Sequence, residues 1–285
     1  MDRQETIEKP FSDVREPQSP SSGPRATEPR GPWLQLSVPH GFEWNRHRLP
    51  IPNLPPELEG FRIVQISDLH LRPFWSEVYD QLIARVRREA PDLIVITGDF
   101  VNNKRNHTRE APFAHRLVSQ LEARHGVFGI LGNHDQYTLP PKLKGSGIVM
   151  LDGRRQVLNV NGADLELIGL PGVIRSDVTR QLLESFPPKQ STVPRIVLSH
   201  YPDILRKAQP LEPDLYFAGH THGGQICLPG GIPIIRHDSL PRSIGRGVNR
   251  VKDTWLVVSR GLGFTTLPIR LFCPAEVVEV TLSRG

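Results

Sequence analysis

Two histidines stand two positions apart in the glycine-rich stretch GHTHGGQ, at residues 219–225. Imidazoles are common ligands of divalent metal ions, but one pair of histidines is weak evidence for a site. The interpretation therefore depends on whether other ligand-type residues stand at comparable places along the chain. Such residues do occur, each soon after a short apolar segment. The seven candidate ligands are Asp68, His70, Asp99, Asn133, His200, His220 and His222.

These candidate ligands follow five segments that are typical of buried β-strands. The segments are FRIVQIS (61–67), DLIVITG (92–98), GVFGILG (126–132), RIVLSH (195–200) and DLYFAGH (214–220). Each is a short, largely apolar run, as expected of a strand that is buried on both faces. Sites in open α/β sheets form outside the carboxyl ends of the strands. We therefore predict that five strands bring the candidate ligands to one edge of the fold.

Helical patterns alternate with the first strands. Apolar residues recur every four positions in 76–90 and in 112–123, which predicts one buried face on each helix. Ser76 is a candidate N-cap of the first helix, and Pro91 follows its end. Further β-segments are expected at 163–170, 254–261 and 275–282. The alternation of strand and helix favours right-handed crossovers and predicts two packed sheets with helices outside.

The beginning of the chain differs in composition from the rest. Residues 1–32 are rich in Pro, Glu, Arg and Ser and contain a single aromatic residue, Phe11, so they cannot bury enough apolar area to fold. We predict a disordered polar tail at 1–32 and one domain at 33–285. Within that domain, 33–44 is expected to form an edge strand and 49–60 a proline-rich approach to the core.

Composition also limits the class of protein. No stretch of about 18 apolar residues occurs, so no transmembrane helix is expected, and the polar N-terminus lacks the apolar core of a signal peptide. The predicted location is the cytoplasm, with peripheral contact with the inner membrane left open.

Cys227 and Cys273 form no zinc motif, and we expect both to be buried and reduced. The net charge of +5 favours an anionic substrate, a phospholipid surface or nucleic acid, without choosing among them.

The ligand types indicate the metal. Carboxylate, imidazole and amide oxygen without thiolate suit Mn²⁺, Fe²⁺ or Zn²⁺, and Mn²⁺ is our first expectation. Seven ligands exceed one tetrahedral site, but they suffice for two ions if one carboxylate is shared. Two ions about 3.5–4 Å apart are the usual arrangement for clamping a phosphate ester and activating water. Gly98, Gly132 and Gly219 directly precede candidate ligands, where we expect a sharp turn or a close backbone approach.

Each candidate also has an ordinary interpretation when it is taken alone. Asp68 is compatible with a turn or a helix cap, His200 with a surface position, and GNHD at 132–135 with a simple turn. Five such coincidences together are a weaker explanation than one shared site. The remaining histidines do not end an apolar strand beside a second ligand. We expect structural or solvent-exposed roles for His40, His47, His107, His115, His125 and His237.

In order and spacing, the candidate residues resemble the signature of the calcineurin-like metallophosphoesterases. The matching motifs are Asp68-x-His70, Gly98-Asp99, Gly132-Asn133-His134-Asp135, His200 and Gly219-His220-x-His222. The resemblance covers roughly residues 60–282. The stretches SDLHL, GVFGILGNHD, GHTHGGQICLP and SRGLGFTTLPIRLF are most similar to a bacterial branch that includes membrane-associated phosphodiesterases and a UDP-2,3-diacylglucosamine pyrophosphatase. The implied fold, of α+β and α/β character, is a four-layer α-β-β-α sandwich of two mixed sheets flanked by helices.

The resemblance also implies a role for each residue. The implied ligands are Asp68, His70, Asp99 and His222 for one ion, and Asp99, Asn133, His200 and His220 for the other. Asp99 would bridge the two ions, and a hydroxide between them would attack phosphorus in line. His134 matches the family histidine that stabilises the phosphoryl oxygens or protonates the leaving group. Asp135 is expected to orient His134 through a hydrogen bond.

Arg270 is a candidate substrate ligand. It stands in LPIRLF, between Ile269 and Leu271, after the glycine-rich SRGLG that the branch shares. One interpretation is an arginine that caps the sheet edge. The other is an arginine that points toward the metals and donates charge-assisted hydrogen bonds to phosphate. Two features depart from the branch: the polar N-terminus, and the proline-broken segment 136–151 after GNHD, where a regular helix is usual.

The sequence thus predicts a dinuclear hydrolase of phosphodiester or diphosphate bonds, with a lipid-linked substrate such as UDP-2,3-diacylglucosamine. A phosphomonoesterase or phosphoprotein phosphatase is the alternative among enzymes. A non-catalytic scaffold with the same fold is the alternative outside them, but a scaffold is free to lose ligands and all seven are present. Nothing in the sequence reads a nucleobase, so no nucleic-acid partner is expected. The oligomeric state is left open.

Overall fold

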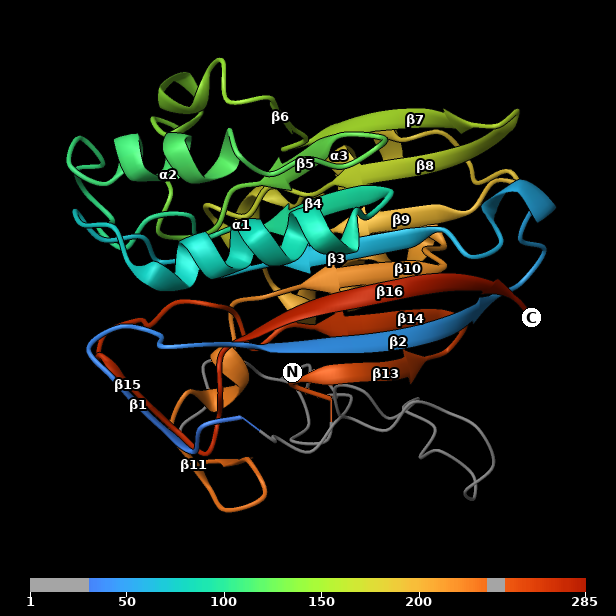
Figure 1. Cartoon of the computed structure of the whole chain (residues 1–285). Coiled ribbons are helices and arrows are strands. Elements are labelled where there is room, and N and C mark those ends of the chain that lie inside the picture. The colour runs from blue at the N-terminus through green and yellow to red at the C-terminus, as the bar shows by residue number, and fades with distance from the viewer. Residues whose placement is uncertain (1–30, 235–243) are drawn as a thin grey trace, which may run out of the picture.

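Apolar strands of the chain pair into two six-stranded sheets that pack face to face (Figure 1). The computed structural model describes residues 31–234 and 244–285. Nearly all of the predicted tail at 1–32 lies outside the described residues, as does His237. Within the described ranges, every helix is too short or too polar to cross a bilayer.

The first sheet combines parallel and antiparallel pairs. Its strand order is β2 (Glu43–Ile51), β16 (Glu276–Arg284), β3 (Arg62–Ile66), β4 (Leu93–Thr97), β5 (Val127–Ile130) and β6 (Ile148–Met150). The pairs from β3 to β6 are parallel, whereas β16 is antiparallel to β3. In β4, Leu93 and Val95 face the second sheet, while Ile94 and Ile96 pack on the opposite face. This burial on both faces explains why the segment is a continuous apolar run.

The second sheet is parallel at its centre and antiparallel at its margins. Its strand order is β13 (Gly247–Val251), β14 (Thr254–Val258), β10 (Leu215–Ala218), β9 (Arg195–Leu198), β8 (Ala163–Gly169) and β7 (Arg154–Val160). β14, β10, β9 and β8 are parallel neighbours. β13 and β7 each return antiparallel at one margin. Both sheets are therefore mixed, as the sequence predicts.

Helices cover the outer face of each sheet. The helices are α1 (Glu77–Glu89) and α2 (Ala111–Val118) on the first sheet, and α3 (Arg180–Ser185) and α4 (Leu205–Ala208) on the second. Val78 and Leu82 of α1 pack with Val64 of β3. Leu205 of α4 packs with Val197 of β9. The predicted four-layer α-β-β-α sandwich is therefore confirmed.

Two boundaries differ from the sequence-based expectation. α2 ends at Val118 instead of near residue 123, because the residues that follow form i→i+3 turns. The segment 49–60 does not begin as an approach to the core, since Leu49, Pro50 and Ile51 complete β2. Proline is tolerated there because β2 is an edge strand.

Two short strand pairs lie beside the main sheets. They are β1 (Leu34–Leu36) with β15 (Ile269–Leu271), and β11 (Cys227–Leu228) with β12 (Ile232–Pro233). The predicted edge strand at 33–44 thus divides into β1 and the start of β2. Cys227 and Cys273 are both free and buried, as predicted.

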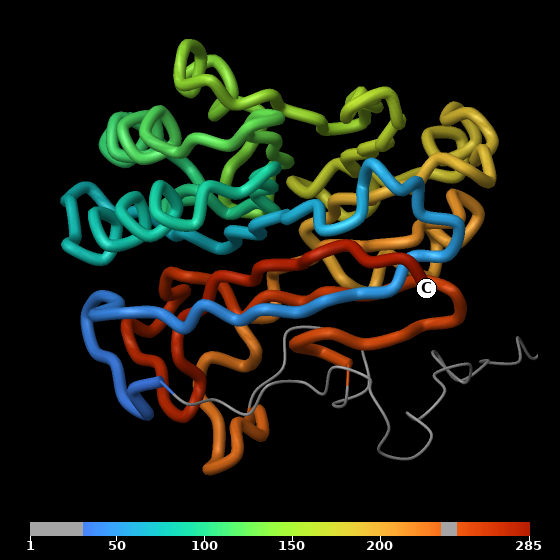
Figure 2. Tube along the Cα trace, turned by 45° about the vertical axis from the view of Figure 1, so that its right-hand side comes forward, coloured from blue at the N-terminus to red at the C-terminus, as the bar shows by residue number. Residues whose placement is uncertain are grey.

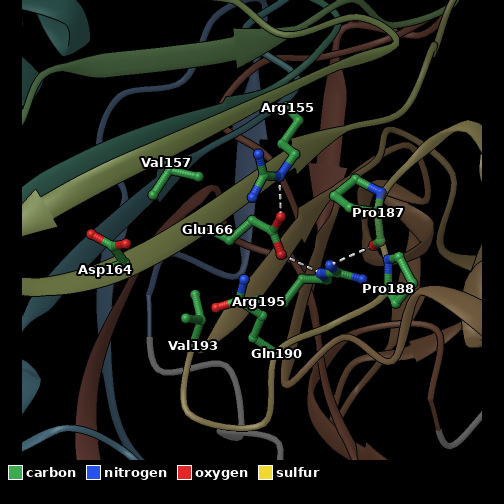
Figure 3. A pocket seen from close by; sticks show the side chains of 9 residues that line it. All are labelled: Arg155, Val157, Asp164, Glu166, Pro187, Pro188, Gln190, Val193 and Arg195. Carbon is green, nitrogen blue, oxygen red and sulfur yellow. Dashed lines mark hydrogen bonds and ion pairs between the residues drawn. The ribbon is translucent and has the colours of Figure 1, made fainter.

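A buried ionic cluster ties β7, β8 and β9 together (Figure 3). Glu166 of β8 accepts hydrogen bonds from the guanidinium groups of Arg155 and Arg195. Arg195 is 1% exposed and also donates to the carbonyls of Leu211 (2.7 Å) and Pro187 (2.9 Å). The small pocket beside these residues lies where β9 begins, at the opposite end of the strand from His200.

Replacement of Glu166 should destabilise the fold without affecting the distant sheet edge. Glu166→Ala leaves the buried Arg195 without its carboxylate, a loss of about 3–5 kcal/mol in the free energy of unfolding. Urea denaturation measures this loss. The control is Asp164→Ala on the same strand, whose exposed side chain should matter by less than about 0.5 kcal/mol. Equal unfolding midpoints for the two variants would contradict the assignment.

Candidate metal centre

The candidate ligands follow the carboxyl ends of β3, β4, β5, β9 and β10, which point to the same side of the molecule in Figures 1 and 2. Backbone hydrogen bonds continue beyond the strands and fix these segments together. Asp68 N donates to Gly98 O (3.0 Å), His70 N to Asp99 O (2.9 Å), and Gly219 N to His200 O (3.1 Å). The ligand segments of both sheets are therefore held by the ladders that form the core.

Glycine is required where these segments meet. A Cβ on Gly219 would lie 2.0 Å from Ser67 Oγ and 2.4 Å from Asp68 Oδ2, and one on Gly132 would lie 2.2 Å from Asp99 Oδ1. Several ligands themselves adopt positive φ, a conformation that is rare outside glycine. They are Asp68 (49°), His70 (41°), Asp99 (55°), His220 (69°) and His222 (51°). Such strain is typical of functional sites, and the surrounding structure must hold it.

One group of side chains surrounds a shared space beside β3. The ligand atoms of Asp68, His70 and His222 all lie within 4.8 Å of one another. His70 Nε2 lies 3.0 Å from His222 Nε2, which in turn lies 3.4 Å from Asp68 Oδ1. Asp99 Oδ2 lies 3.4 Å from the same His70 nitrogen. Two imidazoles and two carboxylates thus converge in one buried place.

A second group adjoins the first through Asp99. Asp99 Oδ2 also lies 3.4 Å from His200 Nε2. That nitrogen lies 3.0 Å from Asn133 Oδ1 and 3.2 Å from His220 Nδ1. The structure therefore brings all seven candidate ligands together as two quartets, and the Asp99 carboxylate stands between them.

The protonation states of the group beside β3 suit cation binding. Burial lowers the pKa of His70 to about 3. Burial, followed by repulsion from His70 and Arg270, holds the pKa of His222 well below its usual range. Both rings are therefore neutral and able to offer a nitrogen lone pair. Burial raises the pKa of Asp68 to about 6, a cost that a bound cation would offset.

Contacts within the cluster show what a metal would satisfy. The imidazole Nε2 atoms of His70 and His222 approach each other at 3.0 Å, so without a metal one of these nitrogens must carry a proton for the other to accept, whereas a metal would take the lone pairs of both. Ser67 Oγ donates to Asp68 (2.6 Å), and His200 Nδ1 lies 2.9 Å from Thr97 O, so that both ligands are oriented from behind. Clustered carboxylates and oriented imidazoles are the donor set expected for Mn²⁺, Fe²⁺ or Zn²⁺.

His134 lies beside both quartets without belonging to either set of predicted ligands. Its ring meets the His70 ring edge to face, with the centroids 4.5 Å apart. Its backbone N–H donates to Asp99 Oδ1 (2.8 Å), and its Nδ1 lies 2.8 Å from the carbonyl of Asn102. Burial lowers the pKa of His134, which favours the neutral ring.

The expected hydrogen bond between Asp135 and His134 is wrong. The Asp135 carboxylate accepts the backbone N–H groups of Gly132 (2.7 Å) and Val101 (3.2 Å) instead. Asp135 is completely buried, and burial, with the nearby Asp99 charge, holds its pKa well above the usual range. Its place is to fix the GNHD loop, while the Asn102 carbonyl orients His134. Sequence offers no signal for Asn102, because any residue supplies a carbonyl.

The guanidinium of Arg270 is not free to face the candidate metal centre. The prediction that it binds phosphate directly is therefore wrong. The Arg270 side chain is completely buried. Nη2 donates to the carbonyls of Arg260 (2.7 Å), Gly263 (2.7 Å) and Gly261 (3.1 Å) and lies 3.3 Å from His222 Nδ1. Because these contacts occupy the guanidinium, Arg270 braces the His222 loop from behind. The alternative of an arginine that caps the sheet edge is wrong only in its position, since Arg270 has a structural role but is internal.

The chain is similar in sequence to known proteins. A model of the calcineurin-like phosphoesterase family matches residues 61–224. The metallophosphoesterase YkuE of Bacillus subtilis is 30% identical over 261 residues, which cover 86% of each chain. Phosphodiesterase YaeI of Escherichia coli is 28% identical over 88% of this chain and 92% of its own. UDP-2,3-diacylglucosamine pyrophosphatase LpxG of Chlamydia trachomatis is 28% identical over 69% of this chain and 74% of its own.

The bracing role of Arg270 predicts a stability effect and no direct effect on substrate binding. Arg270→Lys keeps the charge but loses the planar fork that reaches several carbonyls, a loss of about 1–3 kcal/mol in the free energy of unfolding. Thermal denaturation should show a lower Tm, while KM for a small soluble diester stays unchanged. Arg88→Lys, at an exposed position of α1, is the control. An unchanged Tm with a raised KM would restore the direct contact with phosphate.

Proposed function

Because the chain belongs to the calcineurin-like phosphoesterase family, whose members are metal-dependent hydrolases, we propose that it hydrolyses phosphodiester or diphosphate bonds at a dinuclear metal centre. The observation that carries the proposal is the pair of ligand quartets that share Asp99. One ion is assigned to Asp68, His70, Asp99 and His222, and the other to Asp99, Asn133, His200 and His220. Mn²⁺ remains the first expectation, with Fe²⁺ or Zn²⁺ as alternatives.

Bound cations at this place supply a nucleophile from water at neutral pH and neutralise charge on the phosphoryl oxygens. The protein holds Asp99 between the two sets of ligands with the His134 backbone N–H on its other oxygen. Burial of the site excludes bulk water from the carboxylates and imidazoles, which strengthens their interaction with any charge placed among them. This pre-arranged environment is the main contribution of the fold to the reaction.

His134 is assigned to the substrate. Its Nδ1 is committed to the Asn102 carbonyl, so Nε2 is the nitrogen that remains for a phosphoryl or leaving-group oxygen. The neutral ring is favoured in the free protein. An anionic phosphoester placed beside the ring favours the protonated form, which donates from Nε2. His134 thereby stabilises the phosphoryl oxygens or protonates the leaving group.

The relatives support a lipid-linked or diester substrate. One relative is named a phosphodiesterase, and another is named for pyrophosphatase action on UDP-2,3-diacylglucosamine. The net charge of +5 fits an anionic substrate of either kind. Contact with a membrane surface and the cytoplasmic location predicted from the sequence belong to the same proposal.

A hydrolysis screen tests the proposal directly. Purified, Mn²⁺-loaded protein is offered bis(p-nitrophenyl) phosphate, p-nitrophenyl phosphate and UDP-2,3-diacylglucosamine. We expect cleavage of the diester or the diphosphate, with about two ions per chain by elemental analysis. Preference for the monoester would favour a phosphatase, and no hydrolysis with full metal content would favour a scaffold.

Asp99→Asn should lower the metal occupancy of both sites, since it removes the shared negative charge. The control is Asp253→Asn, which alters an exposed residue and should not lower the occupancy.

His134 should affect the reaction and leave metal binding intact. His134→Ala is expected to lower kcat by about 10²–10⁴, the usual contribution of a general acid or base, with metal content near normal. The control is His40→Ala, which alters an exposed histidine. Steady-state kinetics and elemental analysis are made on the same samples. Joint loss of metal and activity would place His134 among the ligands instead.

A further inference from the structure

A β-bridge joins the two short strand pairs, β1 with β15 and β11 with β12, and we call these four strands the small sheet. Leu34 pairs with Leu271 in β1 and β15. Leu271 forms a bridge with Ile226, just before β11, and Ile226 accepts a backbone hydrogen bond from Ile234 (3.1 Å). Leu228 pairs with Ile232 across the β11–β12 turn. Four strands from three segments of the chain therefore align side by side.

The alternation of side chains in this small sheet is inverted. Gln35 (1% exposed) and Arg270 (0%) face inward, whereas Leu34 (38%) and Leu36 (46%) on the same strand as Gln35 face outward. Cys227 is buried between outward-facing neighbours. Strands with one solvent-exposed face normally place apolar residues on the inner face and polar residues on the outer face. Because apolar side chains face outward here, the outer surface is suited to contact an apolar partner.

We call this outer surface the apolar face. Strand register and backbone pairing place its residues on one side of the small sheet, and several are about half exposed. Its members are Leu34, Leu36, Ile226, Leu228, Ile232, Ile234, Ile269 and Leu271. Trp33, 59% exposed, stacks on Phe272 beside it. An apolar patch of this kind on a soluble fold marks an interaction surface.

Charge distinguishes what the apolar face can meet. The three segments that build it, 31–42, 226–234 and 261–275, contain no Asp or Glu. Arg246 adds a positive charge at the β11–β12 turn, where its guanidinium contacts the carbonyls of Gly230 and Gly231. Arg246 therefore attracts a partner that has anionic groups over an apolar interior, and these three segments have no carboxylate that would repel it. Tryptophan beside such a face is typical of residues at a bilayer interface.

The sequence outside the described residues does not supply the missing apolar partner. Residues 1–30 contain six acidic residues and only four large apolar side chains, which are Met1, Ile7, Phe11 and Val14, and residues 235–243 contain only two, Ile235 and Leu240. Segments of this composition cannot cover eight aliphatic residues. The partner of the apolar face is therefore expected to be another body.

The apolar face is backed directly by the candidate metal centre. On the inner side of the same small sheet, Arg270 contacts His222, and the Cys227 thiol donates to Gly223 O (3.3 Å). Figure 1 shows β1, β15 and β11 at the end of the molecule toward which β3 and β10 point. A body bound to the apolar face would thus lie next to the ligand loops.

We propose that the apolar face docks on an anionic lipid bilayer and presents the metal centre to a phosphoester at the level of the headgroups. The proposal rests on the proposed function only in taking the substrate to be lipid-linked. Aliphatic side chains of β1 and of the β11–β12 turn enter the boundary between headgroups and acyl chains. The positive charge of Arg246 beside the apolar face, with no acidic residue in the three segments to offset it, makes binding stronger on anionic than on neutral lipid.

Vesicle sedimentation of the full chain tests the proposal. Vesicles of phosphatidylglycerol and phosphatidylcholine in equal parts should bind the protein more tightly than pure phosphatidylcholine. Leu36→Glu and Ile232→Glu should each weaken binding roughly ten-fold or more, because each removes the burial of one aliphatic side chain in the bilayer. The control is Val149→Glu, which alters a comparably exposed residue on β6 at the far margin of the first sheet and should bind as the parent does.

Hydrolysis of bis(p-nitrophenyl) phosphate without vesicles separates this proposal from the proposed function. All three variants should retain it, which shows that they fold and keep the metal centre. Retained vesicle binding without any hydrolysis would leave docking in place and remove the proposed function. Docking is overturned if the parent fails to bind vesicles or if Leu36→Glu and Ile232→Glu bind as the parent does. Docking is also overturned if the parent is a dimer by sedimentation velocity, binds no vesicles, and becomes a monomer when Leu36 is replaced by Glu. The apolar face would then be the contact between two copies of the chain.

Discussion

The shared position of the Asp99 carboxylate is the constraint on which the rest of the site depends. One of its oxygens lies 3.4 Å from both His70 and His200, so the ends of two different sheets must stop at the same place. The gap between the sheets allows this only where glycine replaces a side chain, as at Gly132 and Gly219. The packing of the apolar layer between the sheets therefore also determines the geometry of the polar cluster at its edge.

Burial makes this cluster costly without a cation. Asp68, Asp99 and Asp135 are all buried, and burial raises the pKa of Asp68 to about 6. The fold meets part of this cost with donors placed behind the carboxylates, such as Ser67 for Asp68 and the backbone of Gly132 for Asp135. Such donors orient the ligands but do not neutralise the charge of the cluster. A site of this kind is best explained by the metal dependence of its family.

Sequence reasoning succeeded where function follows from strand ends and failed where it depends on backbone partners. The five strands and the convergence of the polar residues that follow them could be predicted, because burial on both faces and the polar residue after each strand are local patterns. Two packed sheets with helices outside were predicted from the alternation of strand and helix, and the mixed character of the sheets from the family resemblance. The roles of Asp135 and Arg270 could not be predicted, because their partners are N–H groups and carbonyls that any residue can supply. The end of α2 at Val118 depends likewise on local turns that the apolar spacing does not record.

The small sheet explains why Arg270 was difficult to interpret from its neighbours. An arginine between Ile269 and Leu271 suggests a polar residue that reaches out from an apolar strand, but in this sheet the apolar residues are the ones that face outward. The inward face needs a donor because it closes over the carbonyls of Arg260, Gly261 and Gly263 and the ring of His222. The outward face is left to the aliphatic side chains. One short strand therefore braces a candidate metal ligand on one side and forms an apolar surface on the other, so the position of that surface relative to the metal centre is fixed by the strand itself.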